Sequence, residues 1–182
     1  MFNILKLLVV VVTICYPFIV YWGLSSDNLV FVALLMTTLL TIKLATQVYK
    51  KQTGLSDILP PMLGLFVIIF AMVYQDIRGF LYYPVIVNLT LLVTFSLSLF
   101  YGQPVITRLA QITTPLDDEG KKYTRQLTKV WVTFFSFNAL IALITTQLSL
   151  DVWTLYNGGI SYILIGLLAG GEWIYRKRIL AQ

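Results

Sequence analysis

The sequence predicts an all-α integral membrane protein, a bundle of six transmembrane helices with a short cytoplasmic amphipathic helix between its fourth and fifth spans. Of its 182 residues, 58% are hydrophobic and only 12% are charged, about half the charge of an ordinary soluble domain. This composition excludes a soluble globule and a disordered chain. Six apolar runs follow one another, over residues 5–24, 29–49, 58–75, 80–101, 130–148 and 152–175.

Each apolar run has the length of a membrane-spanning helix. A helix needs about 20 apolar residues to cross about 30 Å of hydrocarbon, whereas a transmembrane strand needs about 9–11. The runs lack the alternation of barrel strands, and backbone groups in lipid must be hydrogen-bonded within their own segment. We therefore expect six helices in a single membrane domain, residues 1–182. The first run carries no small-x-small cleavage site, so we expect a retained anchor.

Two of the six spans contain residues that disturb a regular helix. Pro17 removes an i→i−4 hydrogen bond in the first span, so we expect a kink there. Asn157-Gly158-Gly159 near the start of the sixth span has two interpretations. One is a broken helix of the kind that binds ions in transporters, and the other is a loose first turn at the membrane interface.

The basic residues predict the orientation of the spans. If successive spans alternate in direction, only Arg78 falls on one side of the membrane. The other twelve basic residues fall on the opposite side: Lys6, Lys43, Lys50, Lys51, Arg108, Lys121, Lys122, Arg125, Lys129, Arg176, Lys177 and Arg178. Basic residues concentrate on the cytoplasmic side of membrane proteins. We therefore expect a bacterial inner-membrane protein with both termini in the cytoplasm, and we attribute the net charge of +5 to membrane topology, not to nucleic-acid binding.

The cytoplasmic segment 102–129 is the only connection long enough to hold structure of its own. After Pro104, the apolar residues Val105, Ile106, Leu109 and Ile112 recur at helical spacing, opposite Arg108 and Gln111. This pattern is typical of an amphipathic helix that lies on the inner leaflet. The segment also supplies a candidate inner-leaflet surface for anionic lipid headgroups, formed by Arg108, Lys121, Lys122, Arg125 and Lys129.

The second half of this segment predicts the start of the fifth helix. Thr114-Pro115 offers an N-cap and a first-turn proline. The acids at 117–119 then lie at the positive end of the helix dipole, and we expect the i,i+4 pairs Asp117–Lys121 and Asp118–Lys122. The three acids could also hold Mg²⁺, but the glycine and two lysines that follow favour a solvated helix start.

The sequence lacks the residues of the common catalytic sites. It has no histidine and a single cysteine, Cys15, and it carries no nucleophile elbow or phosphate loop. We therefore expect no enzymatic activity, no metal site and no cofactor.

Polar residues inside the spans are candidates for function, because they are costly in lipid. Asn88 and Asn138 are deep and uncharged, and they either form hydrogen bonds between helices or line a substrate path. Glu172 lies about one turn inside the end of the sixth span. It either pairs with Arg176 at the headgroups or faces the bundle interior as a proton- or cation-coupled site.

Several aromatic and arginine motifs resemble the intracellular septation protein A family, also called YciB. The resemblance covers nearly the whole chain and rests most on Gly-Gln-Pro-Val-Ile-Thr-Arg-Leu (102–109), Trp131 with Phe134-Phe135, Asp151-Val152-Trp153 and Ile174-Tyr175-Arg176. A sister group of bacterial membrane proteins, encoded beside aryl-polyene and fatty-acid biosynthetic genes, is similar as well. The resemblance implies an inner-membrane protein of cell-envelope maintenance and septation, and it implies no catalytic residues.

Two main functional hypotheses follow. The first is a non-enzymatic envelope protein that contacts membrane lipids and division or envelope-synthesis membrane proteins. The second is a small transporter or lipid-handling accessory to fatty-acid or aryl-polyene-type biosynthesis, which requires Glu172, Asn88 and Asn138 to converge on one cavity.

Overall fold

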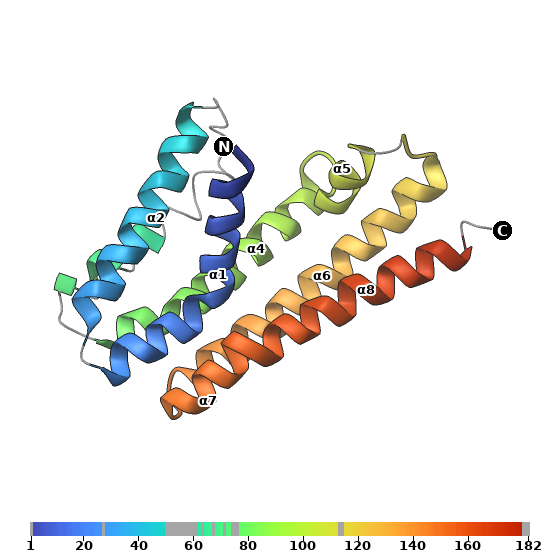
Figure 1. Ribbon diagram of the computed structural model, residues 1–182. Coiled ribbons are helices and arrows are strands. Elements are labelled where there is room, and N and C mark those ends of the chain that lie inside the picture. The colour runs from blue at the N-terminus through green and yellow to red at the C-terminus, as the bar shows by residue number, and fades with distance from the viewer. Residues whose placement is uncertain are drawn as a thin grey trace.

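The computed structural model describes residues 2–26, 28–49, 62, 64–66, 68–70, 72–73, 77–112 and 115–179. Every regular element within these ranges is helical, as Figure 1 shows, which confirms the all-α prediction. In chain order the elements are α1 (Phe2–Ser25), α2 (Leu29–Tyr49), the 3-10 helix η1 (Ile77–Tyr82), α4 (Tyr83–Phe100), α5 (Val105–Gln111), α6 (Asp118–Thr145), α7 (Leu150–Leu155), the π turn η2 (Tyr156–Ile160) and α8 (Ser161–Ile179).

Among the residues that the structure describes, four helical segments are long and apolar enough to cross a membrane. They are Val30–Tyr49, Gly79–Phe100, Asp118–Thr145 and Leu150–Ile174, and they coincide with the second, fourth, fifth and sixth predicted spans. The first predicted span, 5–24, falls within α1, whereas half of the residues of the third, 58–75, lie outside the described ranges. These four helices are compatible with a multi-pass membrane protein.

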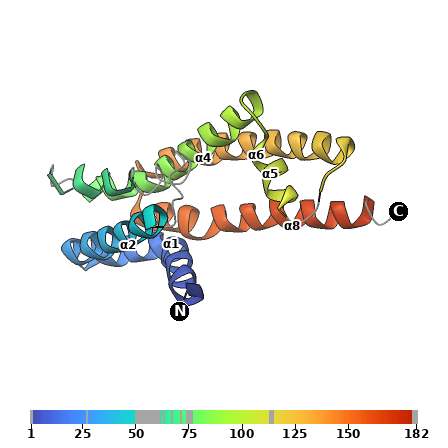
Figure 2. The ribbon, with the colours of Figure 1, turned by 90° about the horizontal axis from the view of Figure 1, so that it is seen from above.

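Helix α1 is bent, as Pro17 predicts. Figure 2 shows its N-terminal part directed away from the long helices α6 and α8, while its second half lies beside α2. The ring of Pro17 is fully buried. The bend therefore places one face of the proline turn against the rest of the bundle.

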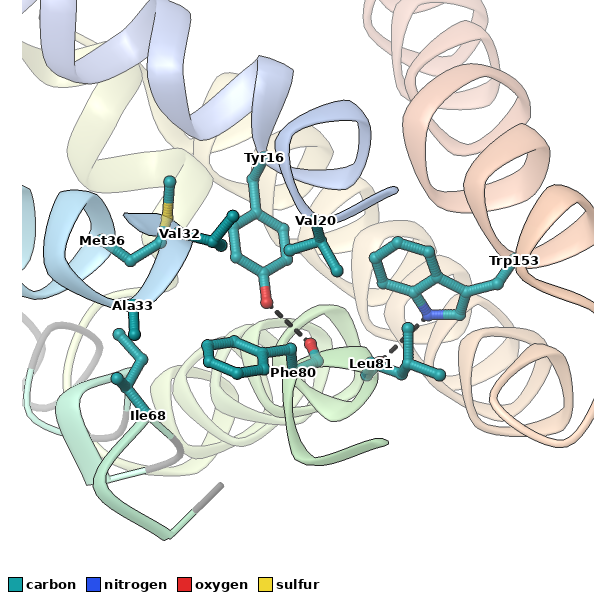
Figure 3. Close-up of a cluster of buried hydrophobic side chains, with 9 residues drawn as sticks. All are labelled: Tyr16, Val20, Val32, Ala33, Met36, Ile68, Phe80, Leu81 and Trp153. Carbon is teal, nitrogen blue, oxygen red and sulfur yellow. Dashed lines mark hydrogen bonds between the residues drawn. The ribbon is translucent and has the colours of Figure 1, made fainter. Parts of the chain in front are cut away.

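A cluster of buried apolar side chains joins α1, α2, η1 and α7 at one end of the molecule (Figure 3). At its centre, the hydroxyl of Tyr16 donates to the carbonyl of Phe80 at 2.6 Å, and the indole N–H of Trp153 donates to the carbonyl of Leu81 at 3.0 Å. The last carbonyls of a short helix have no partner within it, and a buried carbonyl without a donor is costly. Two aromatic side chains thus satisfy the end of η1 and fix it to α1 and α7.

Helices α4 and α6 lie side by side along most of their length (Figures 1 and 2). Phe95 of α4 meets Phe135 of α6 edge to face, with ring centroids 5.1 Å apart. Helix α5 then packs across the start of α6, where the hydroxyls of Thr107 and Thr124 are hydrogen-bonded at 2.8 Å. This antiparallel pair supplies the framework on which α7 and α8 are placed.

The start of α6 differs from the prediction. The helix begins at Asp118, and its N-cap is Asp117, whose carboxylate accepts the N–H of Gly120 at 2.8 Å; Thr114 lies outside the described residues. Because the Asp117 carboxylate is engaged with the backbone, the expected pair with Lys121 is replaced by an ion pair between Lys121 and Asp118 at 3.0 Å.

Candidate functional site

The two asparagines that the sequence predicts inside the membrane meet between α4 and α6. The side-chain amide of Asn138, on α6, donates to the side-chain oxygen of Asn88, on α4, at 2.8 Å. Asn88 in turn donates to the carbonyl of Pro84 at 2.8 Å, one turn earlier in its own helix. Both residues are buried, and Asn138 is only 3% exposed. The predicted hydrogen bond between spans four and five is therefore present.

Asn138 also binds the segment that runs from α7 through η2 into α8. Its second amide hydrogen is directed to the hydroxyl oxygen of Ser161, at 2.9 Å, and its carbonyl oxygen accepts the hydroxyl of Tyr156 at 2.7 Å. An asparagine side chain has two N–H donors and one carbonyl acceptor, so both N–H groups and the carbonyl oxygen of Asn138 have a hydrogen-bond partner here. One side chain of α6 thus connects α4, η2 and α8.

A second pair of polar residues lies about two turns further along α6. The amide of Asn157 donates to the hydroxyl of Thr145 at 3.1 Å and to the carbonyl of Trp153 at 2.9 Å. Thr145 passes its own hydroxyl hydrogen back to the carbonyl of Ala142 at 2.7 Å. We call Asn88, Asn138, Thr145, Tyr156, Asn157 and Ser161 the polar network.

The π turn positions the residues that α7 and α8 contribute to this network. The N–H of Ser161 bonds to the carbonyl of Tyr156, five residues earlier, so the turn is wider than an α-helical turn. This widening brings Tyr156, Asn157 and Ser161 to the buried side together. The helix is therefore neither broken nor loosely started at Asn157-Gly158-Gly159, because it continues through a π turn that α1 and α6 cover.

Gly158 in the π turn permits the close approach of α1. A Cβ atom at this position would lie 3.0 Å from the ring of Phe18 and 3.3 Å from the Cβ of Pro17, whereas a Cβ at Gly159 would meet nothing within 4 Å. Contacts below about 3.4 Å are tighter than carbon atoms prefer. The proline bend of α1 and the π turn therefore fit against each other at a single glycine.

Glu172 is not brought to the asparagines. It lies on α8, half-buried, eleven residues after Ser161, which corresponds to about 16 Å along a helix that rises 1.5 Å per residue. The convergence of Glu172 with Asn88 and Asn138, on which the transport hypothesis depends, is therefore absent from this arrangement.

The residues of the candidate inner-leaflet surface all lie near the junction of α5 and α6, and all are exposed: Arg108, Lys121, Lys122, Arg125 and Lys129. Arg125 also donates to the carbonyl of Leu99, near the end of α4, at 2.9 Å. Leu109 and Ile112, from the predicted apolar stripe of α5, are 56% and 79% exposed, while Thr107 on the other side of this helix is buried against α6. Helix α5 therefore leaves Arg108, Leu109 and Ile112 exposed, while Thr107 faces α6.

Sequence reasoning singled out three members of the polar network and missed three. Asn88 and Asn138 were predicted as polar residues inside spans, and Asn157 as part of a motif that disturbs the sixth span, whereas Thr145, Tyr156 and Ser161 carried no prediction. The spacing of these polar residues along the sequence could have indicated the network. Asn138 and Thr145 are seven residues apart on one helix, and Asn157 and Ser161 are four apart on the next, so each pair shares one face.

Amides and hydroxyls make up this network, so its members act as uncharged donors and acceptors of hydrogen bonds. Among the residues that the structure describes, no group of three or more His, Cys, Asp or Glu side chains is placed to hold a metal ion. Comparison with protein families, with curated proteins and with solved structures finds no match to this chain. Membership of the septation family stays a prediction.

Proposed function

We propose that this chain is a non-enzymatic inner-membrane protein of cell-envelope maintenance and septation, acting through contacts with lipids or other membrane proteins. The observation that carries this proposal is the polar network. The deep asparagines are bonded to neighbouring helices, which is the use of such residues in holding a bundle together. The resemblance to the septation family supplies the envelope role.

The proposal includes six spans with both termini in the cytoplasm. Three connections predicted on the outer side meet at one end of the molecule, where Leu24 and Leu150 pack against the cluster that contains Phe80 and Leu81. Helix α5, the start of α6 and the end of α8 lie toward the other end (Figure 1). This arrangement supports alternating spans, and the basic residues support the orientation.

Thiol labelling tests this topology. In a Cys15→Ser background, cysteines at Ser26, Arg78 and Ser149 should react with an impermeant reagent on intact spheroplasts. Cysteines at Lys121 and Lys177 should react only after lysis. Labelling of the Lys121→Cys variant in intact spheroplasts would overturn the orientation.

Complementation tests the envelope role. The exposed positions Leu109 and Ile112 are changed together to Asp, which should leave the bundle folded but keep α5 off the inner leaflet. The matched control places Asp at the exposed polar positions Gln103 and Gln147, away from the basic residues of α6. In a deletion strain under envelope stress, the control should rescue growth and septation, and the Leu109→Asp, Ile112→Asp variant should fail. Full rescue by that variant, at equal expression, would remove the segment from the proposal.

A further inference from the structure

The exposed face of α6 carries a row of basic side chains on its first turns. Lys122, Arg125 and Lys129 are all exposed, and they are spaced i, i+3 and i+7, so they lie along one side of the helix. Thr124 and Thr128, on the other side, are buried, with Thr124 bonded to Thr107 of α5. From Lys122 to Lys129 the row extends about 10 Å along the helix axis.

The same exposed side changes character in order along the helix. After Lys129 come Thr133 and Ser136, whose hydroxyls bond to carbonyls of their own helix, and then the exposed apolar side chains of Phe137 and Leu140. Before the basic row come the exposed acids Asp118 and Glu119. Along this side of α6 the exposed side chains are therefore first acidic, then basic, then neutral polar and finally apolar. A helix that passes from water through lipid headgroups into hydrocarbon would carry its side chains in this order.

The middle of the basic row is held in place. Arg125 donates to the carbonyl of Leu99 at 2.9 Å, which fixes the guanidinium beside the end of α4. Phe100 and Tyr101, the next residues of that end, are about 80% exposed. Aromatic residues at such a position are typical of the membrane interface, so they mark the same level as the basic row.

We propose that Lys122, Arg125 and Lys129 form a binding site for the headgroup of an anionic phospholipid of the inner leaflet. The charges complement a phosphate diester, and the apolar side chains below them offer contact to the acyl chains. The acids above the row make an acidic protein partner a poor fit at the same place. This inference deepens the proposed function, because it rests on the placement of α6 in the membrane and names the lipid class that its cytoplasmic end binds.

Native mass spectrometry of the full-length protein, titrated with phosphatidylglycerol or phosphatidylcholine, tests the site. The variant is Lys122→Gln with Lys129→Gln, which keeps the Arg125 contact to α4. Its matched control, Lys177→Gln with Arg178→Gln, removes the same charge elsewhere on the predicted cytoplasmic side. Each basic residue near an anionic surface contributes about 1 kcal/mol, so the Kd for phosphatidylglycerol should rise about 30-fold in the variant.

The control should bind phosphatidylglycerol with nearly the wild-type Kd, and phosphatidylcholine should bind weakly to all three proteins. An equal loss in variant and control would show a diffuse attraction and overturn the site, as would an unchanged Kd in the variant or equal affinity for the two lipids. Thermal unfolding of the variant should match that of the wild type, because both lysines are exposed. Failure of the lipid site would appear only in the lipid titrations, whereas failure of the proposed function would appear in thiol labelling and complementation.

Discussion

Replacing Asn138 with leucine should lower the stability of the helix bundle without creating a cavity at its centre. Leucine has the same branched skeleton of four side-chain heavy atoms as asparagine, with bulkier methyl groups, so the change removes three hydrogen bonds, to Asn88, Ser161 and Tyr156, and leaves no cavity. Hydrogen bonds between membrane helices average about 0.6 kcal/mol and reach about 1.7 kcal/mol. Three of them give about 2 kcal/mol at the average value, which is about a 30-fold change in the folding equilibrium.

The assay is reversible unfolding in mixed detergent micelles, followed by tryptophan fluorescence. Ser136→Ala on the same helix is the matched control, because the Ser136 hydroxyl is exposed and bonds only to its own helix, at Val132; it should change stability by less than about 0.5 kcal/mol. A double-mutant cycle sharpens the test. Tyr156→Phe should cost about 0.6–1.7 kcal/mol in the wild type and nothing in the Asn138→Leu background. An Asn138→Leu variant as stable as the wild type would refute the reasoning.

Two further changes address the packing of α1. Gly158→Leu should destabilise the protein by about 1–3 kcal/mol through overpacking against Pro17 and Phe18, whereas Gly159→Leu, with open space, should be tolerated; equal unfolding midpoints would contradict the close approach. Tyr16→Phe should cost about 1–3 kcal/mol, because the buried carbonyl of Phe80 loses its donor. The exposed Tyr49→Phe serves as control, and matching losses in the two variants would show that the phenol contact contributes nothing.

The sequence predicted those features that follow from composition and local rules. Apolar run length located four of the described helices, a proline inside a run indicated the bend of α1, and two asparagines in apolar surroundings indicated a bond between helices. The cap of α6 was misplaced because Thr114-Pro115 and Asp117 are both good starting signals, and local rules do not rank them. The π turn was not predicted, because its stability depends on Pro17 and Phe18 of α1, which lie about 140 residues away in the chain.

The π turn also sets the rotational phase of everything that follows it. A residue added to or removed from an α-helix turns the rest of the helix by about 100° and shifts it by about 1.5 Å. The turn from Tyr156 to Ser161 holds one residue more than an α-helical turn. Deleting Gly159 would convert it into an ordinary turn closed by an i→i−4 bond, and Ser161 would stay close to its place beside Asn138. The same deletion within the regular part of α8 would instead turn every later residue by about 100°, so it would be felt at Glu172, on the opposite side of the membrane in the proposed topology. The extra residue of the π turn is therefore the one residue of this segment whose loss the helix can absorb.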